Sequence, residues 1–223
     1  MPLRLLLSAL TKYLVGVVMV GALVMLPAGS VGYWQGWLFM AVLFIPIFIA
    51  GVVMLVRSPE LLEKRLSAKE RASEQSLVVK LSGLLFVAVF VIAGLNWRYG
   101  WCMLPEWAVW SAVVLFLAGY MLYAEVLREN VYLSRTIEVQ AGQKVIDTGL
   151  YAVVRHPMYT ATILLFLAMP LVLSSPLSFA LMLLYIPLII KRIKHEEALL
   201  ERELEGYSDY MRRVKYRLIP YIY

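Results

Sequence analysis

The chain is poor in cysteine, histidine and charge, and each shortage excludes a class of protein. Its single cysteine, Cys102, cannot form an intramolecular disulfide. Because His156 and His195 are the only histidines, we expect no metal site. Charged residues make up 16% of the 223 residues and hydrophobic residues 62%, whereas a soluble domain is about 45–50% apolar. We therefore predict an integral membrane protein, since the excess apolar surface must lie against lipid.

Several common functional motifs are also missing. The chain has no Gly-rich loop of the dinucleotide type, no Walker Lys-Ser/Thr and no Gly-x-Ser-x-Gly. No charged residue is centred in the first three apolar runs, where a proton or ion pathway normally needs one. The sequence therefore argues against a dinucleotide fold, a P-loop protein, a serine hydrolase of this type and a transporter.

Basic residues alternate along the chain in a way that predicts its topology. Six apolar runs cover about 8–26, 36–56, 77–95, 107–127, 158–173 and 177–190. All but one of the 21 lysines and arginines lie at the N-terminus, in the connections 57–80 and 128–155, or in the tail; the exception is Arg98. The positive-inside rule then places both termini in the cytoplasm, and we expect an inner or plasma membrane. The same basic surface predicts contact with anionic membrane lipid, and we expect no nucleic acid partner.

These runs predict an all-α fold, a polytopic membrane helix bundle with about six membrane-embedded segments. We expect one integral membrane domain over residues 1–223. Within it, residues 1–127 provide scaffold spans, and residues 128–223 form the cofactor-binding and catalytic region. The first run lacks a good cleavage site and is expected to be a retained span.

Prolines and serines mark the ends of several expected helices. Ser58-Pro59 indicates the start of an amphipathic helix on the membrane surface. The last two apolar runs are short and contain Pro170 and Pro187, so we expect a bent hairpin that leaves room for a pocket. After it, a cytoplasmic helix is predicted from Lys194 to about Arg213.

Two polar clusters bracket this hairpin. The first is Arg155-His156-Pro157-Met158-Tyr159, and the second runs from Lys191 to Glu197. Polar side chains beside a membrane span usually face a protein interior or a cavity, so we expect a site where the two ends meet. Spacing alone leaves simpler readings open: a helix start at the interface with Pro157 in its first turn, and an ordinary i, i+4 surface pair of Arg192 with Glu196.

The order of these motifs resembles the isoprenylcysteine carboxyl methyltransferase family and its phospholipid methyltransferase relatives. The resemblance covers roughly residues 128–220, whereas the first half matches only as generic spans. The motifs that carry it are Gly149-x-Tyr151, Arg155-His156-Pro157-x-Tyr159, Glu196-Glu197-x-x-Leu200, Tyr207-x-x-Tyr210 and Pro220.

The resemblance implies a membrane enzyme that uses S-adenosyl-L-methionine without a Rossmann domain. It places Arg192 beside the methyl acceptor, so we expect Arg192 and Glu196 to be the catalytic residues. The residues implied for cofactor binding are Gln143, Lys144, Val145, Ile146, Tyr151, Arg155, His156, Pro157, Met158, Tyr159 and Glu196.

The acceptor is expected to be a lipophilic substrate that enters from the bilayer. A carboxylate, such as an isoprenylcysteine-like group, needs no general base and can be held by the planar fork of Arg192. A phospholipid amine or a thiol would have to lose a proton, for which Glu196 or His195 could serve as base. Both chemistries remain open at this point.

Two other classes of function remain as alternatives. An NADPH-dependent sterol-type membrane reductase would carry a similar His-Pro-x-Tyr and a similar acidic-then-tyrosine tail. Arg212 and Arg213 are the one basic pair offered for its 2′-phosphate. A structural membrane protein without catalysis would explain the spans but would leave both polar clusters unexplained. The oligomeric state is left open.

Overall fold

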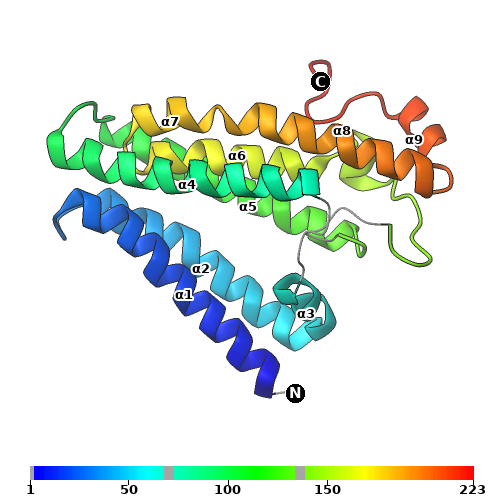
Figure 1. The fold of residues 1–223 in the computed structure, drawn as a ribbon, viewed down its shortest axis with the longest axis horizontal. Helices are drawn as coiled ribbons and strands as arrows, with labels where there is room; N and C mark the ends of the chain where they lie inside the picture. The colour runs from blue at the N-terminus through cyan, green and yellow to red at the C-terminus, as the bar shows by residue number, and fades with distance from the viewer. Residues whose placement is uncertain (1–2, 68–72, 134–138) are drawn as a thin grey trace.

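The computed structural model describes residues 3–67, 73–133 and 139–223, and no strand occurs in these ranges (Figure 1). The prediction of an all-α helix bundle is confirmed. A 3₁₀ turn, η1, covers Gly149–Ala152. In chain order the helices are α1 (Leu3–Ala28), α2 (Trp34–Arg57), α3 (Pro59–Ser67), α4 (Ser73–Tyr99), α5 (Glu106–Glu129), α6 (Pro157–Val172), α7 (Pro176–Met182), α8 (Tyr185–Glu203) and α9 (Tyr207–Arg213).

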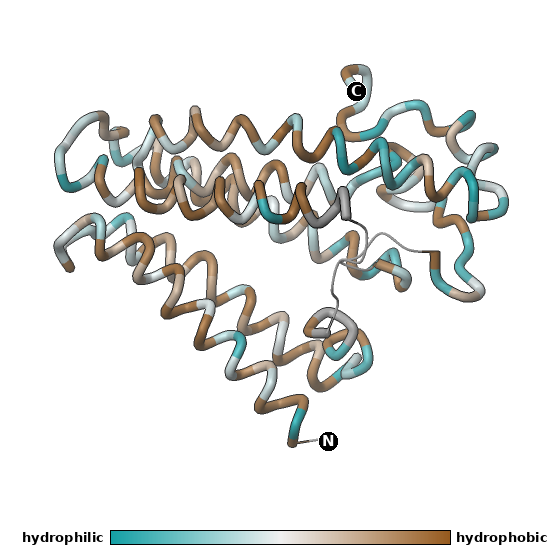
Figure 2. The backbone as a smooth tube through the Cα atoms, viewed as in Figure 1, coloured by the Kyte–Doolittle hydropathy of each residue, from teal (hydrophilic) through white to brown (hydrophobic). Residues whose placement is uncertain are grey.

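The predicted apolar runs all fall on these helices, and Figure 2 shows them as long brown stretches. Within the described ranges, five helical stretches are long and apolar enough to cross a membrane: α1, α2, α4, α5 and the α7–α8 stretch. With 16 residues, α6 is only about 24 Å long, less than the roughly 30 Å of a hydrocarbon core. The chain is therefore an integral membrane protein with one short apolar helix among its spans.

Helices α4 to α8 pack into one bundle, whereas α1 and α2 form a hairpin that diverges from it towards α3 (Figure 1). The hairpin joins the bundle where α1 meets α4. There, a Cβ on Gly94 would lie 2.5 Å from the carbonyl oxygen of Val24, so the close approach of the two backbones requires glycine. Phe39, Phe90 and Phe116 are buried in the core where α2, α4 and α5 meet.

The tail departs from the continuous helix predicted from Lys194 to Arg213. Helix α8 ends at Glu203, and α9 begins only at Tyr207. Gly206 between them has a φ of +83°, a conformation that glycine adopts readily and that ends a helix. The turn buries Tyr207 and Tyr210, so the gain from apolar contact outweighs the helix propensity of the charged stretch.

The last two apolar runs contain a helical break, but it lies at Leu183 and Leu184, between α7 and α8, whereas α6 continues through Pro170 to Val172. Pro176 occupies the first turn of α7, and the Ser175 hydroxyl caps this helix by accepting the Ser178 amide at 3.3 Å. Pro187 lies in the first turn of α8, where no intrahelical donor is lost. Helix α3 begins at Pro59, as the Ser58-Pro59 signal predicts.

A polar network, which we call the distal network, joins helix ends far from α9. It consists of Tyr33, Asn96, Ser174 and Ser178, all of them buried. The Tyr33 hydroxyl donates to the Leu173 carbonyl at 2.6 Å. The Asn96 amide donates to the carbonyls of Cys102 at 2.8 Å and Ser174 at 3.2 Å. The Ser178 hydroxyl donates to the Val89 carbonyl at 2.9 Å.

Candidate active site

The turn η1 is held by the end of α5. Gly149 has a φ of +52°, and a Cβ there would lie 1.7 Å from an oxygen of Glu129. The Glu129 carboxylate accepts the Leu150 amide with its two oxygens, at 2.9 and 3.2 Å. Only glycine leaves room for this contact. Glu129 therefore fixes the turn that carries Tyr151.

Tyr151 is bonded at both ends. Its hydroxyl accepts from the Asn130 amide at 2.9 Å, and its carbonyl accepts from the Tyr210 hydroxyl at 2.7 Å. Burial raises the pKa of Tyr151 to about 12 and also raises the pKa of Tyr210. Both phenols are therefore neutral at physiological pH and keep their protons for hydrogen bonding.

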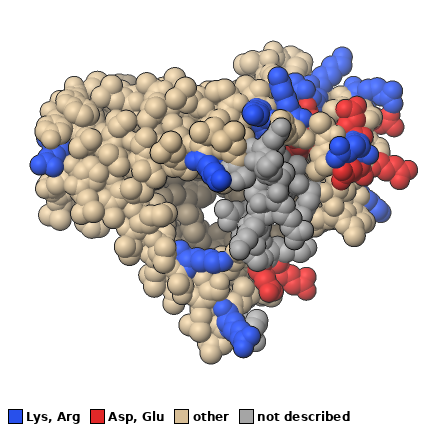
Figure 3. Space-filling model, in the orientation of Figure 1, with Lys and Arg blue, Asp and Glu red and all other residues tan. Residues whose placement is uncertain are grey.

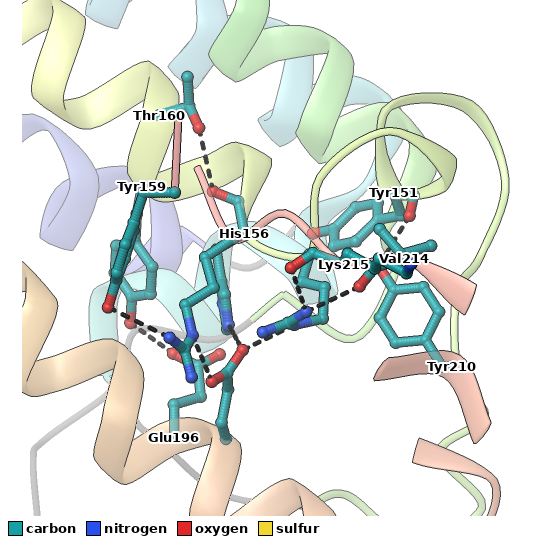
Figure 4. A network of polar contacts seen from close by, with 12 residues as sticks. Tyr151, His156, Tyr159, Thr160, Glu196, Tyr210, Val214 and Lys215 are labelled. Carbon is teal, nitrogen blue, oxygen red and sulfur yellow. Dashed lines mark hydrogen bonds and ion pairs between the residues drawn. The ribbon is translucent and has the colours of Figure 1, made fainter. Parts of the chain in front are cut away.

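An ion cluster lies at the start of α6 (Figure 4), and we call it the Glu197 cluster. It consists of the buried residues Arg155, His156 and Glu197 and of Arg217, whose side chain is 33% exposed. One oxygen of Glu197 lies 2.7 Å from Arg155 Nε and 3.2 Å from His156 Nε2. Its other oxygen accepts from Arg217 Nε at 2.7 Å. Glu197 is only 5% exposed, so the carboxylate depends on these partners to stay charged.

The segment after α9 closes over the same helix start. The amide of Arg155 donates to the Tyr216 carbonyl and that of His156 to the Arg217 carbonyl, each at 2.9 Å. The Arg155 guanidinium also donates to the carbonyls of Val214 and Lys215, at 2.7 and 2.9 Å (Figure 4). The His156 bond satisfies an amide that the start of α6 leaves without a helical partner, and the guanidinium bonds pair carbonyls at and just beyond the end of α9.

Sequence reasoning missed Glu197 and Arg217 as members of the site. A signal for Glu197 was present, because it continues the buried stripe of Ile189 and Ile193 at intervals of four residues on α8. A carboxylate on an apolar stripe requires a buried cation. Arg217 carries no comparable local signal, since its partner lies 20 residues away.

Arg192 and Glu196 meet at the hydroxyl of Tyr159. The hydroxyl donates to Glu196 Oε2 at 2.5 Å, and Arg192 Nε donates to the hydroxyl at 3.0 Å. Tyr159 is 4% exposed, whereas Arg192 and Glu196 are each half-buried. Figure 4 shows Tyr159 and Glu196 facing each other between α6 and α8. The structure thus joins the two expected catalytic residues through a third residue of the predicted set.

A cavity of about 850 Å³, counted out to its open mouth, lies between these elements. Of the residues predicted for the site, Pro157 alone does not line the cavity; it is buried in the first turn of α6. The lining residues are Asn130, Tyr132, Leu133, Gln143, Lys144, Val145, Ile146, Tyr151, Arg155, His156, Met158, Tyr159, Arg192, Glu196, Leu200, Leu204, Tyr207 and Tyr210.

The cavity combines both signs of charge with aromatic walls. Lys144 and Arg192 supply cations, and Glu196 supplies a carboxylate. Tyr207 lies in the wall, and its buried hydroxyl has no hydrogen-bond partner among the described residues. The same described part of the chain holds no group of three His, Cys, Asp or Glu side chains placed to bind a metal ion. Such a site suits a zwitterionic organic ligand.

Three curated proteins that are similar to this chain are Delta(14)-sterol reductases. One from Mus musculus is 32% identical over 91 residues, which is 40% of this chain and 22% of the relative. One from Methylotuvimicrobium alcaliphilum is 24% identical over 54% of this chain and 32% of its own length. One from Arabidopsis thaliana is 27% identical over 56% of this chain and 38% of its own length. The chain therefore spans well under half of each relative.

A family model gives a second comparison. It describes the isoprenylcysteine carboxyl methyltransferase family and matches residues 110–202. This range contains all of α6, the η1 turn and most of α8, and so it includes the Tyr159 contact with Arg192 and Glu196. Over residues 110–202 the chain therefore matches the isoprenylcysteine carboxyl methyltransferase family, as the motifs around Tyr159 and Glu196 predict.

Proposed function

We propose that this chain is a membrane methyltransferase that transfers a methyl group from S-adenosyl-L-methionine to a lipophilic carboxylate, such as an isoprenylcysteine-like group. The observation that carries the proposal is the meeting of Arg192 and Glu196 at Tyr159 on the wall of one cavity. The family match over residues 110–202 supports the same reaction class.

The donor set of the cavity fits this cofactor, which carries a carboxylate, an ammonium and a sulfonium group. Lys144 suits the carboxylate, Glu196 suits the ammonium, and the lining tyrosine rings suit a sulfonium cation. When bound, the cofactor supplies an electrophilic methyl group on sulfur. Methyl transfer is then an in-line displacement, so the protein acts mainly by positioning.

The residues of the chain favour a carboxylate acceptor over an amine or a thiol. A carboxylate is already a nucleophile, and the guanidinium of Arg192 can orient it. An amine or thiol needs a base, but His195 does not line the cavity. Glu196 lines it and already accepts the proton of Tyr159 in a hydrogen bond. Holding an anion is the role that the lining serves best.

A second candidate is an NADPH-dependent reductase acting on a sterol-like substrate, and the names of the three relatives favour it. The basic pair offered for a 2′-phosphate argues against it. Arg213 pairs with Asp147 at 2.8 Å, Arg212 pairs with Asp209, and neither arginine lines the cavity. The cavity therefore lacks this basic pair for the 2′-phosphate of NADPH, whereas its lining includes charged groups suited to S-adenosyl-L-methionine.

The test compares Arg192→Ala with Glu196→Ala. Losing a charge-assisted contact to the acceptor costs about 2–5 kcal/mol, so Arg192→Ala should lower turnover about thirty- to several-thousand-fold while S-adenosylhomocysteine affinity changes less than about threefold. Glu196→Ala should weaken binding of S-adenosylhomocysteine itself. Arg192→Lys should rescue poorly, because a point charge does not replace a planar fork. If both alanine variants keep wild-type binding and turnover, the site assignment is wrong.

We further propose that both termini and the cavity mouth face the cytoplasm, in an inner or plasma membrane. Figure 3 supports a common side, since charged side chains gather at the end that carries α3 and α9. Lys69, Arg71 and Arg135 of the basic connections lie outside the described residues. Reporter fusions after Tyr223 should be active only with cytoplasmic reporters, and activity on the other side would contradict this topology.

A further inference from the structure

Tyr159 connects two residues of α8 from a different helix. A hydroxyl has one proton, and Tyr159 donates it to Glu196 at 2.5 Å, so its oxygen must be the acceptor for Arg192 Nε at 3.0 Å. Tyr159 lies 33 residues before Arg192 and 37 before Glu196. Its hydroxyl is thus a fixed point of α6 to which both α8 side chains are bonded.

The Tyr159 ring is better fixed than the side chains that it contacts. It is 4% exposed, and its centroid lies 5.7 Å from that of the His156 ring. His156 is held in turn by Glu197 at 3.2 Å. Arg192 and Glu196 are long, half-buried side chains that lose much rotamer freedom when they are held in one place. A rigid phenol lowers that loss by holding both before a ligand arrives.

We propose that the Tyr159 hydroxyl is a positioning group that couples the acceptor half of the site, at Arg192, to the cofactor half, at Glu196. The assignment of the two halves rests on the proposed function, whereas the bridge rests on the contacts alone. Without the hydroxyl, Arg192 and Glu196 lose the hydrogen-bonding partner on α6 that they share. The acceptor and the methyl donor are then held independently, although displacement requires them to be aligned.

The proposal predicts a specific pattern for Tyr159→Phe, which keeps the ring and removes the hydroxyl. We expect kcat/KM for the acceptor to fall about 10- to 100-fold, the size of effect that a small misplacement produces. S-adenosylhomocysteine affinity should fall about threefold to tenfold, since Glu196 loses one hydrogen bond. Tyr120→Phe is the matched control, because the Tyr120 hydroxyl donates to the Leu43 carbonyl away from the cavity. It should leave both values unchanged.

Double-mutant cycles separate a bridge from a direct ligand contact. In an Arg192→Ala background at saturating cofactor, Tyr159→Phe should change kcat/KM for the acceptor less than about threefold, because the acceptor-side residue that it positions is gone. In a Glu196→Ala background, it should no longer change S-adenosylhomocysteine affinity. Equal effects of Tyr159→Phe in all backgrounds mean that the hydroxyl acts on the ligand by itself, and the proposal is then overturned. No effect in the wild type overturns it as well.

A ligand-free cycle keeps this test apart from the proposed function. Tyr159→Phe should lower the unfolding temperature of the wild type and should leave that of Arg192→Ala/Glu196→Ala unchanged. If the wild type binds no S-adenosylhomocysteine, the proposed function fails, and this cycle alone decides whether the bridge exists. Equal shifts in both backgrounds would exclude a bridge. Should Tyr159→Phe fail to fold, a cycle of Glu196→Gln with Arg192→Gln replaces it, because both side chains bond the Tyr159 hydroxyl. Their shifts in unfolding temperature should be non-additive, and additive shifts would exclude a bridge.

Discussion

The two buried polar networks of this protein lie at different ends of the bundle and differ in charge. The distal network contains neutral side chains that donate to carbonyls at helix ends, such as Asn96 to Ser174. The Glu197 cluster contains a carboxylate with two arginines and a histidine, and Arg155 and His156 of this cluster line a cavity. Polar burial alone therefore does not identify a functional site in a membrane bundle.

What separates the two networks is the use of their hydrogen bonds. In the distal network, Ser174 both accepts the Leu104 amide at 2.8 Å and takes part in the Asn96 contact, so the groups close the loops between helices. In the Glu197 cluster, the bonds hold the start of α6 against α8 and the tail. Tyr159 lies in this first turn of α6, so the same bonds place its hydroxyl against Arg192. We infer that the first network serves folding and that the second serves folding and positioning together.

Among variants that test this difference between the networks, we expect Glu197→Ala to lose the most folding free energy. It leaves Arg155 and Arg217 without their carboxylate, and removing one partner from a buried ion pair costs about 3–5 kcal/mol. Thermal unfolding in detergent and titration with S-adenosylhomocysteine should both show a loss. Glu201→Ala, one turn further along α8 and exposed, is the control and should change stability by less than about 0.5 kcal/mol. Similar results for the two variants would show that the Glu197 cluster contributes neither to stability nor to ligand binding.

Asn96→Ala tests the other side of the comparison. It removes donors to the carbonyls of Cys102 and Ser174, which should cost about 1–3 kcal/mol of folding free energy. Because the distal network does not reach the cavity, S-adenosylhomocysteine affinity measured at a temperature where the variant is folded should stay at the wild-type value. A parallel loss of affinity would mean that the two ends of the bundle are coupled.

Gly149→Ala and Gly142→Ala form a matched pair of smaller expected effect. Both glycines have positive φ, so a side chain costs about 1–2 kcal/mol at either position. At Gly142 a Cβ meets nothing within 4 Å, whereas at Gly149 it meets Glu129. We therefore expect only Gly149→Ala to displace Tyr151 and to lower ligand affinity in a titration. Equal affinities would show that η1 does not shape the cavity.

The smallest expected effects belong to two tyrosines of α9. Tyr210→Phe loses a hydrogen bond to the Tyr151 carbonyl and should lower the free energy of unfolding by about 0.5–1.5 kcal/mol. Tyr207→Phe removes a buried hydroxyl that has no partner among the described residues, and so it should leave stability unchanged or raise it. Unfolding in detergent measures both, and a larger loss for Tyr207→Phe would contradict the assigned contacts.

The sequence predicted the spans and the local composition of the site well. Long apolar runs gave the helices, and Ser58-Pro59 gave the start of α3, because both signals are local. The motifs also brought most of the predicted cofactor residues to one cavity, although whether they bind a cofactor remains a prediction.

Contacts between distant segments were not predictable in the same way. The tail carbonyls of Tyr216 and Arg217 pair with the start of α6 across about 60 residues, and no periodic pattern encodes such a pairing. The break at Gly206 was missed because the charged residues around it favour helix, whereas burial of Tyr207 and Tyr210 decides the path of the chain. The role of Tyr159 as a bridge likewise depends on how α6 lies against α8.

The central claim is that the cavity binds S-adenosyl-L-methionine, and calorimetric titration of the purified wild type with S-adenosylhomocysteine and with NADPH tests it most directly. With about 26 heavy atoms at about 0.3 kcal/mol each, S-adenosylhomocysteine should bind with a free energy near −8 kcal/mol, which is a Kd of about 1 μM. The account predicts this binding, its weakening in Glu196→Ala, and no heat with NADPH. Saturable binding of NADPH with no response to S-adenosylhomocysteine would contradict it.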